Sequence, residues 1–173
     1  IVEFIYYEEN STFLASSALT TFIGVLLVLT NLEENRKLNL QQAFLLTTLS
    51  WLSIAIFGSI PFIFSDLNLS IVDSFFESMS GITTTGSTII TNLNETPKAI
   101  LLWRAMLQWL GGIGIIVMAI TLMPIMNIGG MQLFAISTSS TPEKILPKSK
   151  EISLRLILIY SVLTIACALF YKI

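Results

Sequence analysis

Three long stretches without a charged side chain most constrain how this chain can fold. They run from Asn10 to Leu32, from Leu38 to Ser65 and from Ala105 to Pro142. Each exceeds the ~20 residues with which a helix crosses about 30 Å of hydrocarbon. A shorter stretch, Leu156 to Tyr171, precedes Lys172. Hydrophobic residues make up 54% and charged residues 12% of the chain, against roughly 45–50% and about 25% in soluble domains. The sequence therefore predicts an all-α membrane protein that contacts the lipid bilayer.

The composition excludes most sites of covalent chemistry. The 173 residues contain no histidine and one cysteine, Cys167, inside the last apolar stretch, so neither a disulfide framework nor a Cys/His zinc site can form. A membrane-embedded enzyme would need an intramembrane His, paired acids or a nucleophile with a base, and the sequence offers none. A structural scaffold is a further alternative. We expect no enzyme activity, no bound cofactor and no nucleic-acid partner.

Basic residues orient the predicted spans. Arg36 and Lys37 lie between the first two apolar stretches, and a second basic group precedes the last: Lys144, Lys148 and Lys150. Because loops rich in Lys and Arg tend to stay in the cytoplasm, both segments are predicted to be cytoplasmic. The chain starts at Ile1 without a basic region and cleavage site, so we expect an internal piece of a longer protein rather than a signal peptide.

The predicted path divides the chain into four parts. Residues 1–39 form a leading transmembrane helix and cytoplasmic loop, 40–128 a helix pair with a polar segment between its members, 129–150 a cytoplasmic loop, and 151–173 the first helix of a further pair. The spans are expected at about residues 11–32, 40–64, 99–126 and from 151 onward. Pro61 and Pro97 are expected to mark helix boundaries.

A short helix is predicted in the polar segment between the second and third spans. Ser70 and Asp73 have the spacing of a capping box. Four apolar residues recur at helical spacing: Val72, Phe75, Phe76 and Met79. The predicted helix covers residues 71–81 and is roughly 15 Å long, about half the hydrocarbon thickness. We interpret it as a re-entrant pore helix that enters from the outside.

The run Gly81–Thr88 after that helix is uncharged and crowded with hydroxyl groups, with four threonines, one serine and two glycines. Backbone carbonyl and hydroxyl oxygens can replace the hydration shell of a cation in a channel. Residues 83–88 are therefore interpreted as a selectivity-filter loop, in which Gly86 lets consecutive carbonyls point the same way. The alternative is an ordinary extracellular loop, which would not need an amphipathic half-helix in front of it.

Two charged residues are predicted near or below the membrane interface, where charge is costly. Glu77 lies within the short helix and Arg104 early in the third span. One interpretation is an ion pair that braces the pore helix against this span. In the other, Arg104 extends to the lipid headgroups and Glu77 faces a water-filled vestibule.

The third span also contains three closely spaced glycines, Gly111, Gly112 and Gly114. They predict a close helix contact or a flexible point in an inner helix. The alternative is that glycine is simply tolerated more often in membrane helices.

Three segments carry a resemblance to a known family: residues 75–88, residues 102–115 and residues 129–133. Together, in this order and spacing, they closely resemble the bacterial TrkH family of potassium-uptake subunits, within the Trk/Ktr/HKT superfamily. The resemblance extends over essentially the whole chain. It identifies the sequence as the N-terminal part of a subunit that holds four consecutive helix, pore-helix, filter and helix repeats around one pore.

The resemblance implies roles for particular residues. Thr84, Thr85, Gly86 and Ser87 would supply one quarter of the filter, with Thr83 at its lower flank and K⁺ held at Thr84 and Thr85. Gly86 favours potassium, because relatives with serine there tend to admit sodium. The filter of tetrameric potassium channels ends in Gly-Tyr-Gly, whereas Ser87 and Thr88 follow Gly86 here, so a less constrained filter is expected.

The resemblance also implies a setting in the cell. Such proteins lie in the bacterial inner membrane, form homodimers and are gated by a cytoplasmic nucleotide-binding subunit of the TrkA type. Proton- or sodium-coupled symport and channel-like conduction are both compatible with it. Two rival assignments are the KtrB branch, which lacks the leading helices and fits residues 11–32 poorly, and a channel subunit that tetramerises around identical filters.

Overall fold

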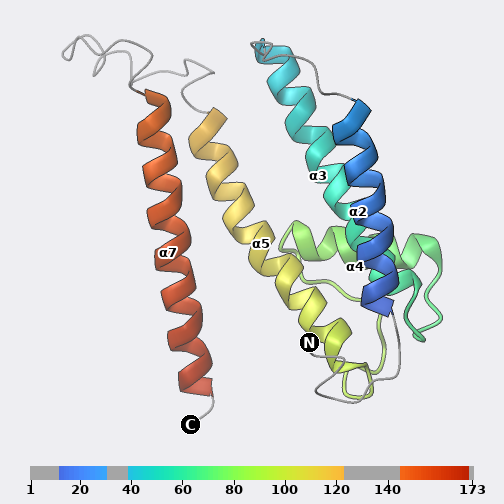
Figure 1. The fold of residues 1–173 in the computed structure, drawn as a ribbon. Coiled ribbons are helices and arrows are strands. Elements are labelled where there is room, and N and C mark those ends of the chain that lie inside the picture. The colour runs from blue at the N-terminus through green and yellow to red at the C-terminus, as the bar shows by residue number, and fades with distance from the viewer. Residues whose placement is uncertain (1–11, 31–38, 123–144, 172–173) are drawn as a thin grey trace. The chain divides into compact units, whose positions relative to one another are not determined.

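The computed structural model describes residues 12–30, 39–122 and 145–171, and all regular structure in these ranges is helical. The helices are α2 (Thr12–Thr30), α3 (Leu40–Ile63), α4 (Ile71–Ile82), α5 (Lys98–Leu122) and α7 (Ile145–Tyr171), shown in Figure 1. All of them except α4 are long and apolar enough to cross a membrane. The chain is therefore a multi-pass membrane protein. Residues up to Gly112 form one compact unit and those from Ile113 another.

The predicted long helices are present, and the boundaries expected at residues 40, 64 and 99 lie within one residue of those observed. The spans expected at about 11–32, 40–64 and 99–126 correspond to α2, α3 and α5, and the expected ends at residues 11, 32 and 126 lie outside the described ranges. The helix expected from Glu151 already begins at Ile145. Pro147 then lies in the first turn of α7, where backbone N–H groups have no partner within the helix, so the N–H that proline lacks is not missed. The motif at residues 129–133 also lies outside the described residues.

Pro61 lies within the last turn of α3, so it is close to the end of the second span, as predicted. Proline removes one backbone donor from the helix, but α3 ends only two residues later at Ile63. The indole Nε1 of Trp103 donates to the carbonyl of Gly58 at 2.9 Å in the same turn. This bond ties α5 to the last turns of α3; the carbonyl that Pro61 leaves without a helical donor is that of Phe57, four residues earlier.

Helix α4 starts as its sequence predicts. The hydroxyl of Ser70 accepts from the amide of Asp73, and the Asp73 carboxylate accepts from the Ser70 amide, which makes a capping box. The predicted apolar face of α4 is only partly covered, since Val72 is 76% and Phe76 43% exposed while Phe75 and Met79 are half-buried. The buried residues are mostly small and polar, with one apolar residue at the end of the helix: Ser74, Glu77, Ser78, Ser80, Gly81 and Ile82. The helix therefore packs largely through hydroxyl, carboxylate and backbone groups.

A small apolar core joins α3 and α5. Phe62, Ile100 and Leu107 are almost fully buried, and Trp103 packs against them. Helix α2 reaches this core at its first turn, where the ring of Phe13 meets that of Trp103 edge-on at 5.9 Å between centroids. The remaining apolar side chains of α2 are largely exposed, as expected for a helix whose solvent is lipid.

Two glycines allow α4 to lie close to its neighbours, one on α5 and one on α3. A Cβ added at Gly111 of α5 would overlap the backbone carbonyl of Ile82 at the end of α4. A Cβ at Gly58 of α3 would lie 2.6 Å from the Ser78 hydroxyl oxygen of α4. At Gly111 the structure has a close contact, and its partner is the end of α4 rather than another long helix. Gly112 and Gly114 are half-buried in an unbroken α5, and their role stays a prediction.

The contact at Gly111 predicts that adding one methyl group there lowers the stability of the fold. Gly111→Ala in a full-length protein carrying this sequence should destabilise the fold by about 1–3 kcal/mol, the usual cost of overpacking, because the obstacle is backbone that cannot rotate away. The measurement is the midpoint of thermal unfolding in detergent.

Gly24→Ala in α2 is the matched control. An added Cβ at Gly24 meets nothing within 4 Å, and alanine is the better helix former, so its unfolding midpoint should stay unchanged or rise slightly. Equal midpoints for the two variants would contradict the contact.

Candidate functional site

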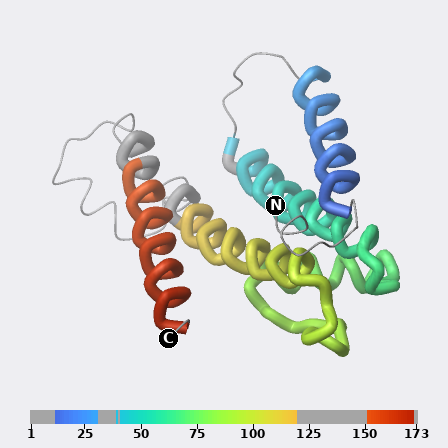
Figure 2. Tube along the Cα trace, turned by 60° about the horizontal axis from the view of Figure 1, so that its bottom comes forward, coloured from blue at the N-terminus to red at the C-terminus, as the bar shows by residue number. Residues whose placement is uncertain are grey.

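The segment between α4 and α5 has neither helix nor strand from Thr84 to Pro97. It runs from the end of α4 to the start of α5 as an irregular loop, which Figure 2 traces in yellow-green. Residues 83–89 are all exposed in the described chain. The filter loop predicted at residues 83–88 therefore lies in one exposed stretch directly after α4, while Gly81 and Ile82 belong to the helix and are buried.

The backbone N–H groups at the start of this loop turn back toward the end of α4. The pairs are Thr83 N to Met79 O at 2.9 Å, Thr84 N to Gly81 O at 2.9 Å, Thr85 N to Ser80 O at 3.0 Å and Gly86 N to Ser80 O at 3.3 Å. The last carbonyls of a helix have no partner within it. These four amides therefore cap α4 and fix the loop to its end.

The carbonyl oxygens of the same four residues, Thr83 to Gly86, are left open. No donor among the described residues forms a hydrogen bond with them. Backbone carbonyls that lack a protein partner need water or another electropositive partner. The loop thus presents consecutive free oxygens on a backbone whose amides are already engaged.

Two backbone torsions explain this arrangement. Thr84 has φ of 59° and Gly86 has φ of 76°, with Thr85 between them outside the left-handed region. Alternation of this kind lets successive carbonyls turn to one side of the chain. A left-handed β-branched residue such as Thr84 is a genuine outlier, and such strain clusters at functional sites. The sequence indicated the special conformation of Gly86 but not that of Thr84.

Gly86 is also confined by its neighbour on α5. A Cβ at Gly86 would lie 3.2 Å from Nε2 of Gln108, which is tighter than ordinary contact. The positive φ and this contact together favour glycine at position 86.

Ser87 differs from the residues before it, because its carbonyl oxygen is engaged. It accepts the hydroxyl of Ser80 at 2.7 Å and lies 3.5 Å from Nη2 of Arg104. The Ser80 side chain is buried, and its residue is 5% exposed. The carbonyl of Ser87 is thereby turned toward α4 and α5.

Glu77 anchors the far side of the loop. Its carboxylate is completely buried, and Oε1 accepts from the hydroxyl of Thr88 at 2.6 Å and from the amide of Ile89 at 2.7 Å. Oε2 lies 2.8 Å from Nε of Arg104, whose side chain is 14% exposed. This contact is an ion pair rather than a well-directed hydrogen bond. Of the two alternatives for these residues, the structure shows the pair.

The structure gathers the predicted residues at one place and adds others. Thr83 to Ser87 lie at the end of α4, with Glu77 and Arg104 behind them. The sequence pattern indicated no role for Ser80, and it placed Thr88 in the filter loop without indicating its contact with Glu77. Both could have been noticed from position alone, since Ser80 follows Glu77 by three residues on the same helix face and Thr88 closes the hydroxyl run.

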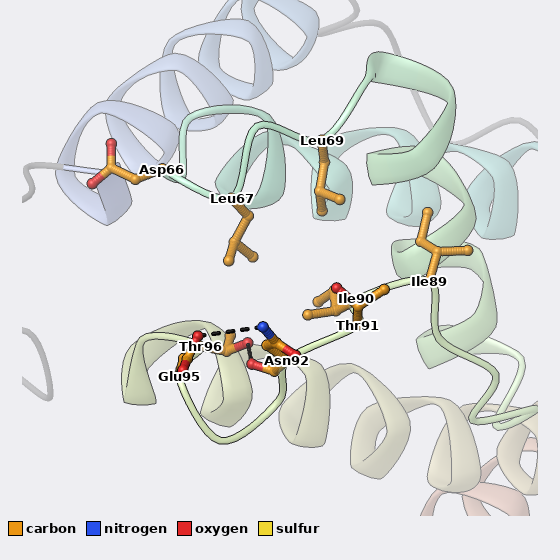
Figure 3. Close-up of a pocket in the computed structure, with 9 residues that line it drawn as sticks. All are labelled: Asp66, Leu67, Leu69, Ile89, Ile90, Thr91, Asn92, Glu95 and Thr96. Carbon is orange, nitrogen blue, oxygen red and sulfur yellow. Dashed lines mark hydrogen bonds between the residues drawn. The ribbon is translucent and has the colours of Figure 1, made fainter.

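A separate pocket of about 320 Å³ lies at the other end of the loop. Figure 3 shows its lining, in which residues before α4 face residues that precede α5: Asp66, Leu67, Leu69, Ile89, Ile90, Thr91, Asn92, Glu95 and Thr96. The side-chain Nδ2 of Asn92 donates to the carboxylate Oε2 of Glu95 at 3.3 Å. The pocket contains none of the residues Thr83 to Ser87.

Similarity to known proteins bears on the identity of the chain. The TrkH family model, described as "Cation transport protein", matches residues 9–173. The Trk system potassium uptake protein TrkH of Escherichia coli K12 is 45% identical over 150 residues, which cover 85% of this chain and 31% of that protein. TrkH of Vibrio parahaemolyticus is 43% identical over 150 residues, with the same coverage.

A third relative extends the match along the chain. The Trk system potassium uptake protein TrkG of Escherichia coli K12 is 33% identical over 175 residues, which cover 98% of this chain and 36% of that protein. The chain thus spans about a third of the length of these relatives. Since the family match includes α4, its loop and all the long helices, the chain belongs to the TrkH family of cation transport proteins.

Proposed function

We propose that this chain supplies one part of a potassium-conducting pore, with α4 as its pore helix and residues 83–88 as its selectivity-filter segment. The relatives are named potassium uptake proteins, and we extend this substrate to the protein that carries the chain. In this proposal the protein conducts an ion and catalyses no reaction, in keeping with a family of transporters rather than enzymes.

One observation carries the proposal: the amides of Thr83 to Gly86 point into the end of α4, while their carbonyls have no donor among the described residues. A row of fixed carbonyl oxygens is what a dehydrated K⁺ requires. The C-terminal end of α4, the negative end of its dipole, lies beside this row and favours a cation.

The exposed loop supports a re-entrant position. Irregular backbone at membrane depth occurs only where it lines water or is buried in protein. In our proposal the exposed face of residues 83–89 borders the pore, and the other repeats of the full-length protein complete it. Residues 40–128 then form the first repeat, preceded by α2 (Thr12–Thr30), and α7 (Ile145–Tyr171) is the first helix of the next repeat.

The proposed ion ligands are the carbonyl oxygens of Thr83, Thr84, Thr85 and Gly86, with K⁺ centred at Thr84 and Thr85. Ser87 is proposed as an ion ligand through its hydroxyl oxygen only, because its carbonyl oxygen already accepts the Ser80 hydroxyl. We further propose a position in the bacterial inner membrane, a homodimer of the full-length subunit, and a cytoplasmic nucleotide-binding regulatory subunit of the TrkA type.

Gly86→Ser tests the proposed filter. Serine at φ of 76° costs roughly 1–2 kcal/mol and would press on Gln108, so the carbonyls around it should shift. We expect discrimination between K⁺ and Na⁺ to fall on the order of tenfold, since about 1.4 kcal/mol is one factor of ten. The measurement is uptake of both ions by cells that lack other potassium importers.

Gly24→Ser serves as its control, because position 24 in α2 has no atom within 4 Å of an added Cβ. This variant should keep the parent's ratio of K⁺ to Na⁺ uptake. A Gly86→Ser protein with that same ratio would contradict the role assigned to Gly86.

The pair of Glu77 and Arg104 is proposed to support the loop, and a double-mutant cycle tests this. Arg104→Gln leaves a buried carboxylate without its cation, which typically costs about 3–5 kcal/mol. Adding Glu77→Gln removes the stranded charge, so the double variant should unfold at a higher temperature than Arg104→Gln alone. If the changes in unfolding free energy of the two single variants add up to that of the double variant, the residues do not act as a pair.

A further inference from the structure

We propose that Ser80 is a positioning residue that ends the row of ion-binding carbonyls at Gly86. Its hydroxyl holds the carbonyl of Ser87 away from the ion path. This inference rests on the proposed function of the loop and assigns to that site a further determinant of ion specificity.

The first step of the argument is the contrast between neighbouring residues. The carbonyls of Thr83 to Gly86 receive no hydrogen bond from the described residues, whereas that of Ser87 receives the Ser80 hydroxyl at 2.7 Å. A bond of this length is a good O–H···O hydrogen bond. Ser87 is therefore the first residue of the loop whose carbonyl points toward the protein, and that carbonyl binds the Ser80 hydroxyl.

The second step is that Ser80 acts on this carbonyl almost alone. The other neighbour, Nη2 of Arg104, lies 3.5 Å away, at the limit of a hydrogen bond. The same guanidinium already pairs with Glu77 through Nε. Without the Ser80 hydroxyl, the Ser87 peptide would be held only by this weak contact.

The third step separates the side chain of Ser80 from its backbone. The Ser80 carbonyl accepts the amides of Thr85 and Gly86, and a substitution of the side chain keeps this acceptor. Ser80→Ala therefore removes the bond to Ser87 and leaves the anchoring of the preceding residues in place. A freed Ser87 carbonyl could turn toward the pore and close around a smaller ion, which lowers the preference for K⁺ over Na⁺.

Helix α4 offers matched controls. Ser74 and Ser78 are also completely buried serines, but their hydroxyl oxygens have no hydrogen-bond partner among the described residues. Ser78→Ala and Ser74→Ala make the same chemical change in the same helix without touching the loop. Ser80→Thr keeps a hydroxyl at the position and serves as the rescue.

The experiment measures K⁺ and Na⁺ uptake by the full-length protein, purified and placed in liposomes. The ratio of the two rates does not depend on the amount of protein. Ser80→Ala should lower this ratio by roughly three- to tenfold, the range expected for one lost hydrogen bond. Ser80→Thr, Ser74→Ala and Ser78→Ala should keep it. If Ser80→Ala yields too little folded protein, Ser80→Cys replaces it, since a thiol is a weak donor and should also lower the ratio.

Two results would overturn the inference while leaving the proposed function intact: an unchanged ratio in Ser80→Ala, or an equal loss in Ser78→Ala. A parent protein that carries both ions at the same rate, or neither, would overturn the proposed function and this inference with it.

Discussion

The buried carboxylate of Glu77 is the interaction on which the loop between α4 and α5 depends. A charge removed from solvent is tolerable only when it is paired and hydrogen-bonded, and Glu77 meets this condition with groups from two different segments. Its oxygens bind the hydroxyl of Thr88, the amide of Ile89 and the guanidinium of Arg104. One side chain of the short helix thus joins the far side of the loop to α5, and the segment between, Thr83 to Ser87, is fixed at both ends.

Helix α5 provides the surface against which this segment is laid. Along successive turns, Arg104 lies near the carbonyl of Ser87, Gln108 near Gly86 and Gly111 against the carbonyl of Ile82. The polar side of α4 faces this framework, while Val72 and Phe76 remain exposed. In lipid an apolar side chain gains little from leaving the bilayer for a protein core, which fits the small and polar residues that make up most of the buried side of α4.

Much of the architecture could be predicted from patterns that act locally. Charge-free length predicted the long helices, and Ser70 with Asp73 predicted the start of α4. The buried side of α4 was harder, because it depends on which neighbouring residues allow a close contact. The same holds for Ser80 and for the torsion of Thr84. Both are set by how the loop folds back on the helix, and no local spacing encodes that. The pairing of Glu77 with Arg104 remained one of two alternatives until the structure brought the residues within 2.8 Å.

The central claim is that the free carbonyls of Thr83 to Gly86 bind a dehydrated potassium ion. Its most direct test is a crystal structure of the full-length protein in which K⁺ is replaced by Tl⁺, whose anomalous scattering locates the ion. The account predicts an anomalous peak in contact with the carbonyl oxygens of Thr84 and Thr85 and none at the carbonyl of Ser87. Anomalous density confined to sites away from residues 83–88, with these carbonyls facing bulk water, would contradict it.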